Sequence, residues 1–131
     1  MHKLKINSSV RSYGLEITSN FKENLKKIYT KGDLLLIDSA VYKKYSLPKI
    51  INKFYIIKIK PSESKKEYLY ITNIISNLLK KKFSKKNKII CIGGGILQDI
   101  TSFLSSILFR GVNWYFFPTT LLAQADSCIG G

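Results

Sequence analysis

Three consecutive glycines at positions 93–95 follow the apolar run 89–92 and precede an amphipathic segment. This order predicts a buried strand, a tight turn and the start of a helix. Glycine lets a bulky anion approach the main chain, and a helix start offers unpaired N–H groups at the positive end of its dipole. The turn therefore suits a phosphate or pyrophosphate, although three glycines also serve as a plain turn. Asp99 lies about one helical turn further on, where its carboxylate can face the same cleft.

A second group of polar residues follows the apolar run 114–117. Thr119 and Thr120 stand in a turn after Pro118, and a helix that carries Asp126 follows. Threonines in such a turn either cap the helix or contact a ligand. A carboxylate accepts hydrogen bonds from sugar hydroxyls. Both turns therefore carry groups suited to a ligand with phosphates and sugar hydroxyls.

The elements around these turns alternate between strand and helix. Two short strands are expected within residues 3–18, and four further strands at 34–37, 54–59, 89–92 and 114–117. Helices are expected between them: one capped by Ser19 or Asn20, a short one through Tyr42 and Tyr45, one with its apolar residues over 69–79, and one over 96–108. This alternation predicts an α/β fold, a mainly parallel sheet with helices on both faces.

The composition fits one globular domain with a modest core. The chain has 131 residues, of which 45% are hydrophobic, so disorder is not expected. No apolar run is long enough to cross a bilayer, and the N-terminus lacks the apolar core of a secretion signal. Cys91 and Cys128 are expected to be reduced core cysteines. These features predict a cytoplasmic protein without a membrane partner.

The net charge of +14 has two interpretations. Every lysine lies before residue 89, a bias that suits a nucleic-acid surface. The lysines are nevertheless spread over all predicted helices and loops, and no aromatic–basic motif for stacking bases is present. Solvated faces are the preferred explanation, so specific nucleic-acid binding is not expected. Because His2 is the only histidine, the chain cannot form an ordinary zinc site by itself.

Several blocks occur in order along the last third of the chain: 93–95 (GGG) followed by Asp99, 109–112 (FRGV), 116–127 (FFPTTLLAQADS) and 126–131 (DSCIGG). In this order and spacing they resemble the 3-dehydroquinate synthases and the wider sugar phosphate cyclase family. The resemblance is close over residues 89–131 and loose over residues 1–88. It implies that residues 1–131 are a Rossmann-like N-terminal NAD-binding domain, incomplete at its C-terminus and without the family's helical metal-binding domain.

The resemblance also implies a reaction. Members of the family use NAD and a divalent metal, zinc or cobalt, on a seven-carbon sugar phosphate. An alcohol is oxidised transiently, phosphate is eliminated, the carbonyl is reduced again and the ring closes. The Glu and two His that bind the metal are not in this chain. By resemblance, the chain is the front part of a 3-dehydroquinate synthase-like lyase of the shikimate pathway, and it is expected to be inactive alone.

The same resemblance assigns roles to residues of both turns. Gly94 and Gly95 would let the pyrophosphate rest on main-chain N–H groups, and Asp99 would bind ribose hydroxyls. Thr119 and Thr120 would donate near the cofactor, or Thr119 would only cap a helix. Asp126, a catalytic candidate, would lie between the nicotinamide and the substrate.

Three further residues resemble the adenosine-ribose site of the family. Asp38 follows strand 34–37 at the sheet edge where ligands collect. Glu63 and Lys66 match the family's Glu-x-x-Lys loop. Each also has a structural interpretation: Asp38 as a helix cap, and Glu63 and Lys66 as a solvated pair.

Arg110 is the second catalytic candidate. The helix before it would carry it roughly 15 Å from the glycine turn, at 1.5 Å per residue. The resemblance implies that it crosses a two-fold homodimer interface and holds the substrate phosphate in the neighbouring subunit. The alternative is a surface arginine that bonds carbonyls at a helix C-terminus.

Gln98 stands where the 3-dehydroquinate synthases usually carry glycine, which leaves the choice of sugar phosphate open. Another sugar phosphate cyclase is one alternative, and an iron-type alcohol or glycerol dehydrogenase is a second. The blocks 110–111 and 118–127 favour the cyclases. A nucleotide-binding module without catalysis is the alternative outside the enzymes.

Overall fold

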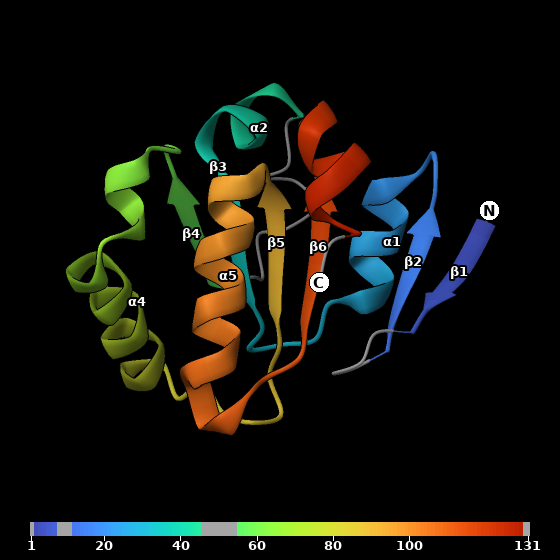
Figure 1. The fold of residues 1–131 in the computed structure, drawn as a ribbon. Coiled ribbons are helices and arrows are strands. Elements are labelled where there is room, and N and C mark those ends of the chain that lie inside the picture. Colours follow the sequence, from blue (N-terminus) through green and yellow to red (C-terminus); the bar gives the residue numbers. More distant parts are fainter. Residues whose placement is uncertain (1, 8–11, 46–54, 130–131) are drawn as a thin grey trace.

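A four-stranded parallel sheet forms the centre of the molecule (Figure 1). The computed structural model describes residues 2–7, 12–45 and 55–129. The strands lie in the order β4 (Tyr55–Ile59), β3 (Leu34–Asp38), β5 (Ile89–Gly93) and β6 (Trp114–Pro118). All four expected strands and the parallel sheet are confirmed. Phe54, expected in β4, and Gly130 and Gly131 of the closing block lie outside the described residues.

Apolar residues on both faces explain why the two central strands are buried along almost their whole length, with only Asp38 at the end of β3 partly exposed. Leu34 and Leu36 of β3 pack into one core cluster, whereas Leu35 and Ile37 pack into the other. The alternation follows from the two-residue repeat of a strand, and a parallel sheet covered on both faces needs apolar residues at every position. The β5 strand repeats this pattern in register, with Leu34 opposite Ile89.

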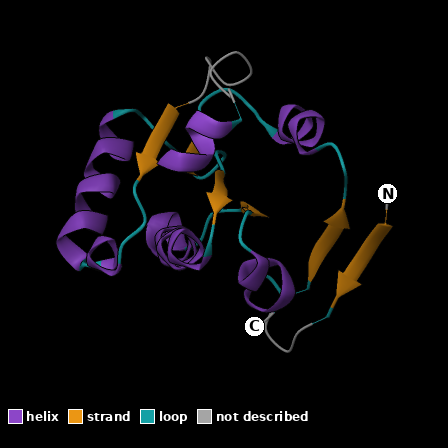
Figure 2. Ribbon diagram, turned by 90° about the horizontal axis from the view of Figure 1, so that it is seen from above, coloured by secondary structure: helices purple, strands orange, loops and turns teal. Residues whose placement is uncertain are grey.

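Helices cover both faces, as expected (Figure 2). On one face lie α4 (Tyr68–Lys80) and α5 (Gly95–Ile107); on the other lie α1 (Phe21–Ile28) and α2 (Ser39–Lys44). Helix α4 buries Ile71, Ile74 and Leu78. Leu69 and Leu79, counted in the same apolar pattern, are 74% and 52% exposed because they fall on the outer side of the helix.

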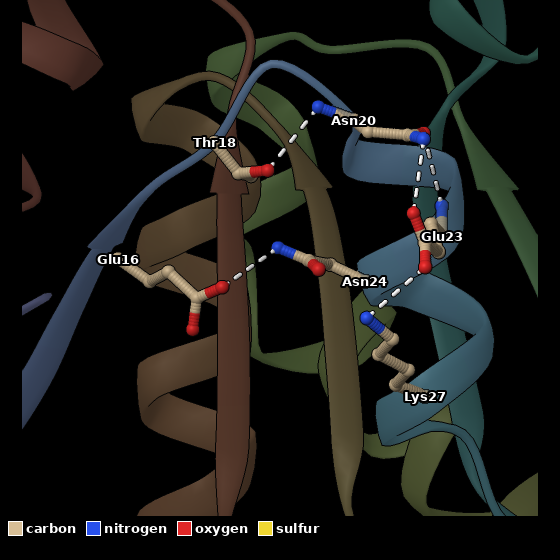
Figure 3. Close-up of polar contacts among 6 residues, drawn as sticks. All are labelled: Glu16, Thr18, Asn20, Glu23, Asn24 and Lys27. Carbon is tan, nitrogen blue, oxygen red and sulfur yellow. Dashed lines mark hydrogen bonds and ion pairs between the residues drawn. The ribbon is translucent and has the colours of Figure 1, made fainter. Parts of the chain in front are cut away.

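The two N-terminal strands, β1 (His2–Ile6) and β2 (Tyr13–Ile17), form a separate antiparallel pair beside α1 (Figure 1). Polar contacts join the end of β2 to α1 (Figure 3). The Asn20 side chain caps α1 by accepting from the Glu23 N–H at 3.3 Å, and the Asn20 N–H donates to Thr18 Oγ1 at 3.1 Å. The expected cap at Asn20 is therefore present.

The strand order reverses between β3 and β5. From β3 the chain passes through α2 to β4 on one side, whereas β5 lies on the other side of β3 and continues into α5. Because α2 and α5 cover opposite faces, a crevice is expected between the carboxyl ends of β3 and β5. Asp38 and Gly93 are the last residues of these neighbouring strands, and Pro118 ends β6 opposite Gly93.

The expectation that both cysteines lie in the core needs correction. Cys91 is buried, but Cys128 is only half-buried because it lies at the end of the helical segment that follows β6 and not in the sheet. Trp114, Phe116 and Phe117 pack against the core but stay partly exposed, since β6 is the last strand of the sheet. In the described part of the chain, no helix has the length and apolar character needed to span a bilayer.

Candidate functional site

The three glycines differ in what surrounds them. A Cβ at Gly93 would lie 2.7 Å from Leu97 Cδ2, and a Cβ at Gly94 would lie 2.9 Å from Thr120 Cγ2. These two positions need glycine for packing. A Cβ at Gly95 would meet no atom within 4 Å, so open space lies beside the first residue of α5. Only this third glycine is left with room for a ligand.

The N-terminus of α5 is a suitable place for an anion. Asn20 caps α1 and Asp38 caps α2 with side-chain oxygens, whereas Gly94, the N-cap of α5, has no side chain to do so. The first N–H groups of this 13-residue helix therefore lack a capping side chain from the described residues. A phosphate group would accept from them and lie at the positive end of the helix dipole.

Three predicted residues meet at Lys66. Its Nζ lies 2.7 Å from Asp99 Oδ2 and 3.1 Å from Glu63 Oε2, which joins the 3-10 turn η1 (Glu63–Lys66) to α5. The hydrogen bond to Asp99, and to a smaller extent that to Glu63, raises the pKa of the Lys66 ammonium group above its ordinary value. Beside this group lies an open, mainly apolar depression lined by Lys66, Tyr68, Ile71, Asp99, Ile100 and Phe103.

Asp38 lies in a different depression at the same edge of the sheet. Its Oδ1 accepts a hydrogen bond from the Ala40 N–H at 2.8 Å, so it caps α2 as the structural interpretation expects. A second depression is lined by Asp38, Ser39, Ala40, Lys43, Lys60 and Pro61. Two lysines and one carboxylate therefore line this depression beyond the end of β3. The capping bond of Asp38 does not prevent its side chain from also contacting a ligand there.

The second turn packs directly on the glycine turn. The Thr119 N–H donates to the Gly93 carbonyl at 2.9 Å. Thr120 Oγ1 accepts from the Ala123 N–H at 3.2 Å, which is the contact of a helix cap. Asp126, in the short helical segment η3 (Ala123–Ser127), is exposed. Within the described part of the chain its carboxylate makes no ion pair.

Sequence reasoning missed two contacts that hold this turn. Gln98 exchanges two hydrogen bonds with Ser127, and the Tyr13 hydroxyl donates to the Ile129 carbonyl at 2.6 Å. In the sequence, Gln98 stands out only as a departure from the family pattern. No sequence signal links Tyr13 to a residue more than a hundred positions away, because only the tertiary fold brings β2 beside this turn.

Arg110 lies at the opposite end of α5, in the 3-10 turn η2 (Leu108–Arg110). Thirteen helical residues separate the two ends of α5, roughly 20 Å at 1.5 Å per residue. Phe109 and Arg110 have left-handed backbone angles, with φ of 50° and 62°. Lys85 Nζ donates to the carbonyls of Phe109 and Gly111, so Lys85 and not Arg110 bonds the carbonyls at this helix end. The Arg110 side chain is exposed.

Metal ligands do not gather in the part of the chain that the structure describes. No group of three or more His, Cys, Asp or Glu lies close enough there to bind an ion. Any metal of a related reaction would need ligands from outside the described residues.

Comparison with known proteins gives a family match over the part of the chain that contains the glycine turn and Asp126. Residues 56–131 match the family model of the 3-dehydroquinate synthase N-terminal domain. The 3-dehydroquinate synthase of Picrophilus torridus is 45% identical over 100 residues, which cover 76% of this chain and 29% of that protein. That of Alkaliphilus metalliredigens is 34% identical over 137 residues, which cover 100% of this chain and 38% of that protein. The chain thus spans about three to four tenths of the length of such relatives.

Solved structures confirm the fold. A 2-deoxy-scyllo-inosose synthase in complex with carbaglucose-6-phosphate, NAD+ and Co2+ has a TM-score of 0.79 at 19% identity, over 96% of this chain and 38% of that one. A 2-epi-5-epi-valiolone synthase from Streptomyces hygroscopicus, with NAD+ and Zn2+ bound, has a TM-score of 0.64 at 24% identity, over 72% of this chain and 28% of that one. At these identities the likeness concerns the fold alone.

Proposed function

The chain belongs to the 3-dehydroquinate synthase family, and we propose that it forms the NAD-binding front part of such an enzyme. The proposal includes the reaction: NAD-dependent cyclisation of a heptulosonate phosphate with elimination of phosphate. It also includes a homodimer as the working assembly. Since the chain spans only part of its relatives, we expect no turnover from these 131 residues alone.

One observation carries the cofactor assignment. The glycine turn and the uncapped start of α5 lie at the point where the strand order reverses, between the ends of β3 and β5. Open α/β sheets bind nucleotides at this place. The open space beside Gly95 gives a pyrophosphate access to the N–H groups there.

The surrounding residues have matching chemistry. Asp99 and Glu63 offer carboxylates to ribose hydroxyls, and the Lys66 ammonium group between them offsets one of their two negative charges. Thr119 presents an exposed side chain beside the glycine turn. When bound, NAD would supply the hydride acceptor and donor. Asp126, exposed on the adjoining turn, would accept hydrogen bonds from the nicotinamide side or from the substrate.

A second candidate within the family is a cyclase for another sugar phosphate. Two solved relatives of the same fold are a 2-deoxy-scyllo-inosose synthase and a 2-epi-5-epi-valiolone synthase. Gln98 stands where the 3-dehydroquinate synthases usually carry glycine. Assays of a catalytically complete form with a heptulosonate phosphate and with a panel of other sugar phosphates would separate these candidates.

Titration calorimetry tests the cofactor assignment directly. We expect the chain to bind NAD and ADP-ribose, which share the pyrophosphate, and not to bind a random DNA duplex at about 0.15 M salt. NAD binding with no DNA binding would support the proposal. Salt-sensitive DNA binding without NAD binding would overturn it in favour of a nucleic-acid module.

A further inference from the structure

The turn that carries Asp126 is tied to α5 by one side chain. Gln98 Nε2 donates to the Ser127 carbonyl at 2.6 Å, and the Ser127 hydroxyl donates to Gln98 Oε1 at 2.7 Å. Both side chains are partly buried. The two bonds run in opposite directions between the same two residues, so together they restrict both sliding and rotation of the turn.

The side chain of Asp126 has no such restraint. It lies directly before Ser127 in the chain, and its exposed carboxylate forms no ion pair with the described residues. The neighbours around it are fixed: Thr120 caps the start of the segment, and Tyr13 holds the Ile129 carbonyl behind it. The position of Asp126 therefore depends on contacts made by the residues on either side of it.

Gln98 also contacts the glycine turn through its main chain. Its main-chain N–H donates to the Gly94 carbonyl at 3.1 Å and closes the first turn of α5. One residue thus holds the proposed pyrophosphate site through its backbone and the Asp126 turn through its side chain. A glycine at this position would keep the first contact and lose the second.

We propose that Gln98 is a positioning residue that acts through Ser127 to fix Asp126 relative to the glycine turn. The inference rests on the proposed function, in which α5 holds the pyrophosphate and Asp126 lies at the nicotinamide end of the cofactor. The contact itself can be tested without any cofactor.

Hydrogen exchange of the chain tests the contact. The amides of Cys128 and Ile129 bond to Ala123 and Asp126 within the turn and report its opening. In Gln98→Met, which keeps the length but loses both hydrogen bonds, we expect these amides to exchange about tenfold faster, with the amide of Leu104 in α5 unchanged. The matched control is Gln124→Met, whose side chain bonds Pro118 and not α5. Unchanged exchange in Gln98→Met would overturn the proposal.

The pH dependence of hydrogen exchange in Gln98→Glu distinguishes the loss of the two hydrogen bonds from a general packing effect. A protonated glutamic acid has one donor and one acceptor, as an amide has in this pair, whereas the carboxylate only accepts. In Gln98→Glu we therefore expect exchange close to wild type at about pH 4 and about tenfold faster at pH 7. Asp99, Lys66 and Asp126, the neighbouring titratable groups, are common to both proteins, and their effect cancels in the ratio. A ratio that does not change with pH would contradict the two-bond contact.

Binding of two ligands, NAD and ADP-ribose, tests whether Gln98 positions Asp126 for the cofactor. We expect Gln98→Met to weaken binding of NAD about tenfold and to leave binding of ADP-ribose, which lacks the nicotinamide, within about twofold. Equal weakening of both ligands, or of neither, would overturn the positioning role. If the wild-type chain binds neither ligand, the proposed function fails, and the exchange experiment still decides whether Gln98 fixes the turn.

Discussion

At the scale of single residues, two glycines of the glycine turn should have different roles: Gly94 is needed for packing, whereas Gly95 leaves room for a ligand. Gly95→Ala adds a methyl group to open space at the start of a helix, so we expect unchanged or slightly higher thermal stability. The same methyl group would stand where a pyrophosphate approaches the N–H groups. NAD affinity should therefore fall about tenfold or more, as measured by calorimetry.

Gly94→Ala is the matched comparison. Its Cβ would lie 2.9 Å from Thr120 Cγ2, and Thr120 cannot move away without losing its cap on Ala123. We expect this variant to lose about 1–3 kcal/mol of unfolding free energy through overpacking. If Gly95→Ala lowered stability as much as Gly94→Ala, or left NAD affinity unchanged, the distinction between the two glycines would be wrong.

The two cysteines should differ in reactivity. Burial raises the pKa of the Cys91 thiol to about 12, so at about pH 8 it stays protonated and unreactive. Cys128 is only half-buried. We expect a thiol reagent to label one cysteine quickly in the native protein and the second only after denaturant is added. Mass spectrometry of the peptides identifies which is which, and fast labelling of Cys91 would contradict the buried core position.

At the scale of elements, an ion pair between partly exposed Lys88 and buried Asp33 joins the loop before β5 to the loop before β3. Asp33 is fully buried; its carboxylate accepts from the Thr30 N–H at 2.7 Å and the Lys88 N–H at 3.0 Å, and Lys88 Nζ lies 2.8 Å away. We expect Asp33→Ala to cost about 3–5 kcal/mol in denaturant unfolding, because two amides lose their acceptor and the Lys88 ammonium, which also donates to Thr30 Oγ1, loses its charged partner. Lys88→Met should cost less, since both amides keep theirs. Equal costs would mean that the ion pair outweighs the amide bonds.

Local sequence patterns predicted the strands and helices well, but not the side-chain contacts between them. Apolar runs and turn residues identified all four strands of the central sheet, since a doubly covered strand needs apolar residues throughout. The spacing of Glu63 and Lys66 suggested a pair, but only the packing of η1 on α5 adds Asp99 to it. The Gln98–Ser127 contact was not predictable, because a glutamine carries no signal of its partner.

At the scale of the whole molecule, the proposed chemistry is spread over both ends of the sheet. Asp126 and the glycine turn lie at the carboxyl ends of the strands, whereas Arg110 lies at the other end of α5 (Figure 1). One subunit therefore cannot bring Arg110 to its own Asp126 without unfolding α5. A second copy related by a two-fold axis could bring the two residues together.

Mixed dimers would decide whether Arg110 acts across subunits. The experiment uses a chimera in which this chain is followed by the C-terminal part of the Alkaliphilus metalliredigens relative, once phosphate release shows that it is active. Arg110 is exposed and its guanidinium suits a bidentate phosphate contact, so we expect Arg110→Ala to lose activity without loss of stability. When inactive Arg110→Ala and inactive Asp126→Ala subunits are mixed and allowed to exchange, half of the dimers are mixed and each has one intact site. About a quarter of wild-type activity should then return. If Arg110 served its own subunit, no mixed dimer would contain an intact site, and activity would stay at the level of the single variants.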